Sequence, residues 1–348
     1  MEVLSPLPLV LLVVLLVAGF AEAFGIGAND LANSAGTSVG SGALRLRQAV
    51  ILIGVLDFLG ATFFGQRVAK TIAKGIVPTE VFVELDPTVL GLCAFAILLA
   101  TATWDNLCSW LGLPVSTSHS TVGSVLGFGL FLALLGDIRL GEIKFAVLGK
   151  IVASWATSPL LGGIMAAFLY TLIRKYLLER APRPEKVERV FAVLQVLSAS
   201  YVAFAHGSND VANAVGPLWI GLGGAGKATP RWLLAFGGAG IVLGILTLGY
   251  RVVATVGWRI TALTPTRGFC AEFSAATVIV GASSLGIPIS TTHTLVGAVV
   301  GVGLARGVHA VDKVVTARIL ASWLLTLPGA AILSMIYLTI VKVVTGAW

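Results

Sequence analysis

Long apolar runs recur along the whole chain, and they limit its fold more than any other feature. Only 11% of the 348 residues are charged and 57% are apolar, whereas soluble domains carry about a quarter charged residues. A water-soluble protein of this composition would expose large hydrophobic patches and aggregate. Helices of about 20 apolar residues satisfy all their backbone hydrogen bonds inside a bilayer. We therefore expect an all-α polytopic membrane protein, with the lipid bilayer as its solvent.

The net charge of +7 does not indicate a nucleic-acid partner. Nucleic-acid binding needs a basic stripe or patch, but here the basic residues stand at the ends of apolar runs. Their densest cluster lies in the middle of the chain. Short basic loops between spans stay in the cytoplasm, so this loop marks the inner side. The residues of the cluster are Arg174, Lys175, Arg180, Arg183, Lys186 and Arg189.

An internal repeat divides the chain in two. Three motifs of the first half return in the same order in the second half. Their offsets are 180, 174 and 168 residues, measured from Asn29 to Asn209, from Ser116 to Ser290 and from Ser154 to Ser322. Near-constant offsets indicate a duplication. We expect a first transmembrane repeat over 1–175, a basic cytoplasmic loop over 176–189 and a second repeat over 190–348.

Each repeat contains about five apolar spans, and we expect 10–12 membrane segments in total, some of them re-entrant or broken. The predicted spans are 4–24, 48–66, 88–110, 120–136 and 145–173, then 190–206, 231–250, 270–287, 295–305 and 314–343. An odd number per repeat predicts that the second repeat is inverted relative to the first, a common plan of secondary transporters. Both termini then lie outside the cell inner (plasma) membrane. Arg67, Lys70 and Lys74 would also lie outside, against the positive-inside rule.

The first polar motif has the form Gly-x-Asn-Asp-x-x-Asn. Asn29 and Asn33 are four residues apart and share a helix face, with Asp30 beside it. Amide oxygens, a carboxylate and carbonyls freed by the glycines are hard donors that suit a small cation such as sodium. Asn and Gly also serve close helix packing, but a carboxylate in both copies favours a sodium site. The predicted ligands of the two copies are Asn29, Asp30, Asn33, Asn209, Asp210 and Asn213.

The second polar motif has the form Pro-x-Ser-Thr-x-His. Proline is favoured in the first turn of a helix, so Pro114 and Pro288 predict helices that begin inside the membrane. Free N–H groups at a helix start bind anions, and the hydroxyls add neutral donors that suit a tetrahedral oxyanion. Helix capping is the alternative role, although it needs only one hydroxyl per helix. The predicted anion ligands are Ser116, Thr117, Ser118, Ser290, Thr291 and Thr292.

Three further polar residues have no polar counterpart in the other repeat. They are Asp57, Gln66 and Glu272, whose counterparts are Ile241, Tyr250 and Leu98. Unmatched polar groups at membrane depth indicate a pathway or site, and we add these three to the predicted sodium ligands. Asp105, next to Trp104, suits an interfacial structural role instead. His119 and His293 either shuttle protons or brace the helix start, and we favour bracing.

Both motifs resemble the repeated signature of the inorganic phosphate transporter (PiT) family, and the resemblance covers nearly the whole chain. It implies inorganic phosphate as the substrate, with the Asn-Asp pairs in a shared cation and phosphate core and both Ser-Thr runs on phosphate. It also implies that Glu272 is needed for transport and that the protein is a homodimer. The residues of the shared core are Asn29, Asp30, Asn209 and Asp210. The short middle loop resembles that of prokaryotic members.

Moving a divalent anion inward against the membrane potential costs about 4.6 kcal/mol per 100 mV, twice the unit-charge figure. Co-transported cations offset this cost, and amide-rich ligands favour sodium because an amide cannot accept a proton. Proton coupling, sulfate as the substrate, and an anion channel remain alternatives. No HExxH or Cys–His pattern of an enzyme occurs, and we expect no cofactor besides co-transported sodium.

Overall fold

The computed structural model describes residues 7–74, 85–224 and 227–346, and these residues form helices and connecting turns without a β-strand. The prediction of an all-α membrane protein is thus confirmed for the described ranges. The helices of the first half are α1 (Leu9–Gly40), α2 (Leu46–Phe64), α3 (Gln66–Lys74), α5 (Pro87–Trp110), α6 (Thr117–Leu135) and α7 (Phe145–Ile173). Those of the second half are α8 (Pro184–Trp219), α9 (Arg231–Thr247), α10 (Tyr250–Ala254), α11 (Pro265–Ser284), α12 (Thr291–Leu304) and α13 (Lys313–Thr345).

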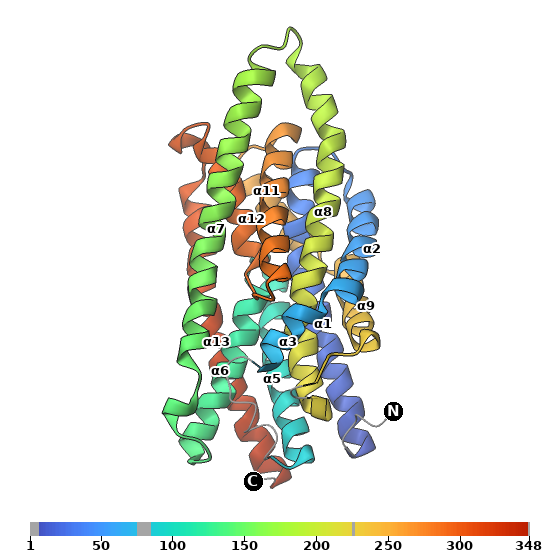
Figure 1. The fold of residues 1–348 in the computed structure, drawn as a ribbon, viewed down its shortest axis with the longest axis vertical. Helices are drawn as coiled ribbons and strands as arrows, with labels where there is room; N and C mark the ends of the chain where they lie inside the picture. The colour runs from blue at the N-terminus through green and yellow to red at the C-terminus, as the bar shows by residue number, and fades with distance from the viewer. Residues whose placement is uncertain (1–6, 75–84, 225–226, 347–348) are drawn as a thin grey trace.

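Seven of the described helices are long and apolar enough to cross a membrane, and a bent pair of helices over 231–259 makes an eighth candidate. α12 is shorter. Figure 1 shows that α5 and α6 occupy the end of the molecule that holds both termini, whereas α11 and α12 occupy the opposite half. Each pair turns back near the middle of the bundle. These two re-entrant hairpins account for the predicted broken segments.

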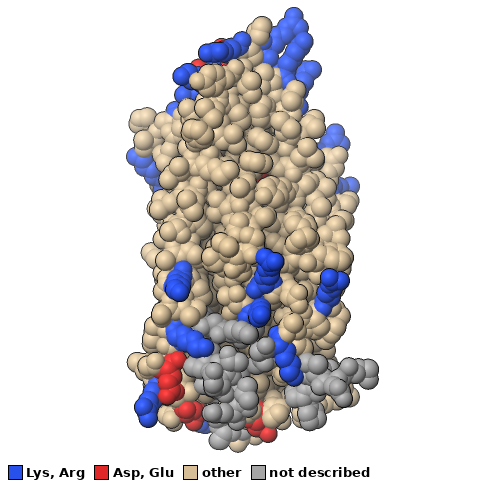
Figure 2. Space-filling model, in the orientation of Figure 1, with Lys and Arg blue, Asp and Glu red and all other residues tan. Residues whose placement is uncertain are grey.

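The two termini lie at one end of the molecule, and the hairpin between α7 and α8 projects from the other end (Figure 1). Lys and Arg side chains gather at the tip of that hairpin (Figure 2). The arrangement agrees with the odd number of spans predicted for each half.

Two helices run further than the sequence predicted. The first span was expected to end at residue 24 and the sixth at residue 206, but α1 and α8 continue through both Asn-Asp motifs. The glycines of the motifs do not free backbone carbonyls, so the expectation that such carbonyls bind a cation was wrong. The glycines allow α1 to pack closely against α9, and α8 against α2. A Cβ on Gly27 would collide with the Ile241 carbonyl, and one on Gly207 with the Asp57 carbonyl.

The two halves of the chain interlock. α7 packs against α12, and α13 packs against α6. Both contacts depend on small residues that bring backbones together, such as Gly163 against Gly301 and Gly127 against Ala331. The hairpin of each half is therefore held by a long helix from the other half.

Candidate functional site

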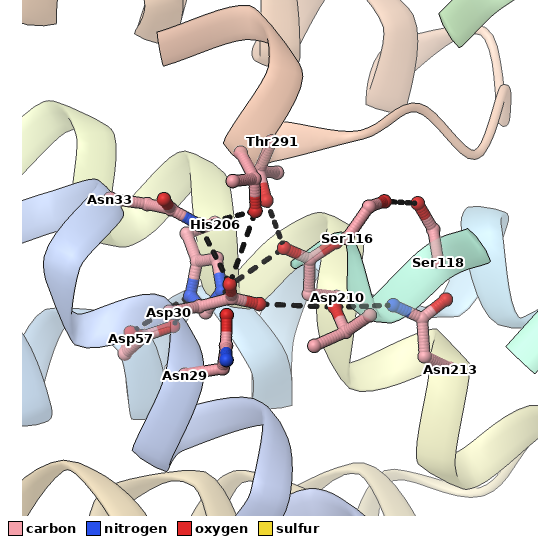
Figure 3. A network of polar contacts seen from close by, with 12 residues as sticks. Asn29, Asp30, Asn33, Asp57, Ser116, Ser118, His206, Asp210, Asn213 and Thr291 are labelled. Atoms are coloured by element: carbon pink, nitrogen blue, oxygen red, sulfur yellow. Dashed lines mark hydrogen bonds and ion pairs between the residues drawn. The ribbon is translucent and has the colours of Figure 1, made fainter. Parts of the chain in front are cut away.

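Three carboxylates and one histidine form a buried cluster where α1 and α8 cross in the middle of the bundle (Figure 3). The Nε2 atom of His206 lies 3.0 Å from Asp210 Oδ2 and 3.4 Å from Asp30 Oδ2. Its Nδ1 atom lies 2.8 Å from Oδ1 of Asp57 on α2. Charges this deep are costly unless they are paired, and here the imidazole connects all three carboxylates.

His206 was not predicted as a site residue. The residue at the same place in the first repeat, by the 180-residue offset, is Ile26. The rule that singled out Asp57, an intramembrane polar residue without a polar counterpart, would also have found His206. Asp57 was predicted as a sodium ligand, and in the structure its carboxylate accepts from His206 at 2.8 and 3.0 Å.

The starts of α6 and α12 point at this cluster from opposite sides. Thr117 donates a hydrogen bond to Asp30 Oδ2 at 3.0 Å, and Thr291 donates to Asp210 Oδ2 at 2.6 Å. The hydroxyl of Thr292 also lies 3.2 Å from Asp30 Oδ1. Three of the six predicted hydroxyls thus reach the carboxylates of the cluster.

The other hydroxyls hold the two hairpins in place. Ser116 and Ser290 cap their helices by accepting from the backbone N–H groups of His119 and His293. Capping was the alternative role, and it holds for these two serines. Ser118 donates to the Ile289 carbonyl at 3.4 Å. In return, Thr292 donates to the Val115 carbonyl at 2.9 Å, so the two hairpin tips touch.

The four asparagines of the motifs divide into two pairs. Asn33 donates to Asp30 at 2.7 Å and to Thr292 at 2.9 Å, and Asn213 lies 3.4 Å from Thr117. These two belong to the cluster. Asn29 and Asn209 instead face the hairpin tips: the Asn29 amide binds Ser109 and the backbone at 113 and 115, and the Asn209 amide lies 2.8 Å from Ser283.

Two predicted sodium ligands lie away from this cluster. Glu272 is buried among hydroxyl and amide donors from α1 and α8, in a second polar cluster. Its carboxylate accepts hydrogen bonds from Thr37, Ser38, Gln195 and Ser198. Gln66 is exposed at the break between α2 and α3 and donates to the Thr229 carbonyl at 3.3 Å. Gln66 therefore lies at a break between two helices, and the hydropathy pattern alone does not show where a helix breaks.

His119 and His293 stack on tryptophans in a paired arrangement. The ring of His119 lies 3.5 Å from that of Trp155, and the ring of His293 lies 3.5 Å from that of Trp323. Each Nδ1 atom contacts the backbone carbonyl of the other tryptophan, at 3.4 and 3.2 Å. These contacts join the hairpins to α7 and α13, which agrees with the bracing role that we favoured.

The central cluster has the chemistry of a cation site. One ligand atom each from Asp30, His206 and Asp210 lies within 4.8 Å of the other two. The amide oxygen of Asn33 is buried and accepts no hydrogen bond from the residues that the structure describes. Carboxylate, amide and hydroxyl oxygens are the donors that hard cations select. The adjoining helix starts present N–H groups that suit an anion.

A helical membrane bundle with two re-entrant hairpins that meet at buried carboxylates is the architecture of a secondary transporter. The sequence profile of the phosphate transporter family matches residues 26–334. A solved structure titled "The sodium-dependent phosphate transporter" superposes with a TM-score of 0.85 at 35% identity, over 97% of this chain and 100% of that one.

Relatives by sequence agree with this match. A Pyrococcus abyssi protein provisionally named a phosphate permease is 39% identical over 96% of this chain and 98% of its own length. The chloroplastic inorganic phosphate transporter 2-1 of Arabidopsis thaliana is 38% identical over 92% of this chain and 70% of its own length. The chain belongs to the phosphate transporter family, which consists of membrane transporters and not of enzymes.

Proposed function

We propose that the protein imports inorganic phosphate together with sodium ions. The observation that carries this proposal is the meeting of the α6 and α12 starts at Asp30 and Asp210. Helix starts attract an anion and carboxylates attract cations, so the two ligands bind side by side and offset each other's charge. The solved relative is titled sodium-dependent, which supports sodium as the coupling ion.

Phosphate would be held by both Ser-Thr runs, with Asn29, Asn209, Asp30 and Asp210 around it. Thr117 and Thr291 now donate to the carboxylates. When sodium neutralises those carboxylates, the two hydroxyls become free to turn toward phosphate oxygens. Binding of the cation and binding of the anion would thus favour each other.

Sodium would occupy the site formed by Asp30, Asn33, Asp210 and Asn213. Glu272 lies in a separate buried cluster, so it would belong to a further sodium site. The hydroxyls that now donate to Glu272 can rotate to offer their oxygen atoms to an ion.

The two sequence halves would act as inverted repeats, since each contributes one hairpin, one Asp and one His–Trp stack to the same centre. The basic α7–α8 hairpin would face the cytoplasm by the positive-inside rule, with both termini outside the plasma membrane. Family resemblance adds a homodimer, which the mass of the protein in detergent would test.

Uptake of labelled phosphate into proteoliposomes tests the proposal. We expect an inward sodium gradient to drive uptake and its replacement by choline to stop it. Asp30→Asn and Asp210→Asn should each abolish driven uptake while the protein elutes from size exclusion like the wild type. Normal sodium-driven uptake in either variant would remove that Asp from the cation site.

Three controls separate the alternatives. Uptake that follows a proton gradient without sodium would replace sodium by protons, and competition by unlabelled sulfate would change the substrate. Uphill accumulation of labelled phosphate, driven by an outward gradient of unlabelled phosphate without any ion gradient, distinguishes a carrier from an anion channel, which shows no counterflow.

A further inference from the structure

A second pair of buried carboxyl groups lies next to the transport site and is not among the ligands proposed for it. Glu22 lies on α1, about two turns before Asp30, and Asp105 lies on α5. Both side chains are fully buried. The sequence placed Asp105 at the membrane interface, but the structure encloses it where α5 packs against α1.

The two acids lie on touching segments of α1 and α5: Asn106 donates to the Ala21 carbonyl at 3.4 Å, and a Cβ on Gly25 would lie 3.4 Å from the Cβ of Asp105. No N–H or O–H group of the described residues donates to either oxygen of Glu22 or to Asp105 Oδ2. No Lys, Arg or His in the described ranges forms an ion pair with them. Two carboxylates buried side by side without a counter-charge repel each other, and a proton bound by one of them removes that repulsion.

The fold does not need polar groups at these positions. By the repeat offsets of 180 and 174 residues, the counterparts of Glu22 and Asp105 are Val202 and Ile279. Both counterparts are buried in one apolar cluster. The first half therefore places two costly buried acids where the second half packs two aliphatic side chains.

Asp105 is connected to the transport site by two short chains of hydrogen bonds. Its Oδ1 atom accepts from Ser120 at 2.7 Å, and Ser120 lies in the first turn of α6, three residues after Thr117. Its backbone carbonyl accepts from Ser109 at 2.7 Å, and Ser109 accepts from Asn29 at 3.1 Å. A displacement of Asp105 would therefore shift both Ser109, at the end of α5, and Ser120, at the start of α6.

We propose that the Glu22–Asp105 pair is a proton-binding site, which holds one proton between the two carboxyl groups and thereby fixes the α5–α6 hairpin at the phosphate site. Loss of the proton leaves two adjacent negative charges, which repel and push α5 away from α1. For its transport readout this inference rests on the proposed function.

A proton fits the pair better than a metal ion. Three carboxyl oxygens lack another partner, whereas hard cations take about six oxygen ligands. The neighbouring titratable groups that act on the pair are carboxylates, which add no positive charge. They are Asp30 on α1 and Asp210 on α8, and Asp105 in turn acts on the thiol of Cys108 on α5.

Titratable groups on the other packed elements are engaged elsewhere. His119 on α6 faces Trp155, Tyr337 on α13 contacts Thr103, and Arg251 on α10 points to the Trp110 carbonyl. A pH response that is removed by changes at 22 and 105 can therefore be assigned to the pair.

Infrared absorption of protonated carboxyl groups in the purified full-length protein tests the proton directly. We expect Glu22→Gln and Asp105→Asn each to remove one protonated-carboxyl band at neutral pH. The exposed Asp86→Asn, at the start of the same helix α5, should leave that band unchanged. A spectrum that neither Glu22→Gln nor Asp105→Asn alters would overturn the site, because both groups would then be ionised.

The phosphate affinity measured against pH at saturating sodium tests the coupling to the hairpin. We expect the affinity of the wild type to fall about tenfold on the alkaline side of the transition, as for a lost hydrogen bond to a charged group. Glu22→Gln should remove that fall. Wild-type pH dependence in a variant that has lost the band would overturn the coupling.

One double variant keeps the test decisive if the single variants fold poorly. Glu22→Val with Asp105→Ile copies the residue pair of the second half, and we expect a folded protein without the band and without the alkaline fall. If the protein did not transport phosphate at all, the proposed function would fail, whereas the infrared result would still decide the proton site.

Discussion

Arg67 donates a hydrogen bond from Nη1 to the carbonyl oxygen of Ser284, 2.7 Å away, and so ties α3 to the tip of the α11–α12 hairpin. At the other hairpin, Arg251 Nη1 lies 3.5 Å from the Trp110 carbonyl. Each arginine meets the last turn of the helix that enters a hairpin, where carbonyls lack partners. Arg67 stood out against the positive-inside rule, and this contact gives it a structural role at membrane depth.

Loss of this contact should slow transport. For Arg67→Gln we expect phosphate uptake about tenfold slower, since a hydrogen bond to a charged donor is worth about 1.5–3 kcal/mol. Lys70→Gln, on the same short helix α3, is the matched control and should keep the wild-type rate. Equal rates in both variants and the wild type would show that the hairpin tip holds without Arg67.

Removal of the imidazole should destabilise the protein. His206→Gln leaves Asp57 buried without its partner, and breaking a buried pair costs about 3–5 kcal/mol. The unfolding temperature in detergent should fall, and adding Asp57→Asn should restore much of it. If the fall in unfolding temperature of the double variant equals the sum of the falls in the two single variants, the two residues are energetically independent.

The hydroxyls of Thr117 and Thr291 should contribute equally to phosphate binding. Thr117→Val and Thr291→Val should each weaken it roughly ten- to hundredfold, the value of a hydrogen bond to a charged group. Thr121→Val is the control, because that hydroxyl donates to the backbone of its own helix at 3.1 Å. A loss in only one of the two variants would place the phosphate site within one half of the chain.

Glu272 should govern the sodium dependence. We expect Glu272→Gln to change the apparent sodium affinity or the number of sodium ions per phosphate, because the amide removes the only negative charge of that cluster. The control is Glu188→Gln, since Glu188 also joins α8 to α11 through Thr266. A sodium titration identical to the wild type would reduce Glu272 to a packing role.

Most span positions could be predicted because apolar runs and Pro-Ser-Thr starts are local signals. α6 and α12 begin within three residues of Pro114 and Pro288. The ends of α1 and α8 were missed because glycine has a poor helix propensity, and here backbone contacts with α9 and α2 override it. A single sequence does not state which helix packs against a glycine.

The site was predicted in part for a similar reason. Motif residues that recur in both halves, such as Asp30 and Thr117, were found from the repeat. His206, Glu22 and Asp105 have apolar counterparts, and their importance lies in contacts between helices far apart in sequence. Gln66 has the same polar character but lies at an exposed helix break, so polarity within a span does not by itself define a site.

The packing of α6 against α13 has a consequence for synthesis. The backbone around Gly123 and Gly127 of α6 fits against Leu327 and Ala331, which leave the ribosome some 200 residues later. Until α13 has been made, it does not cover the polar turn of the α5–α6 hairpin. Lipid, water or the insertion machinery must contact that turn instead. A chain that stops after α12 would lack the helix that packs against α6. Insertion of α13 therefore completes the assembly of the protein.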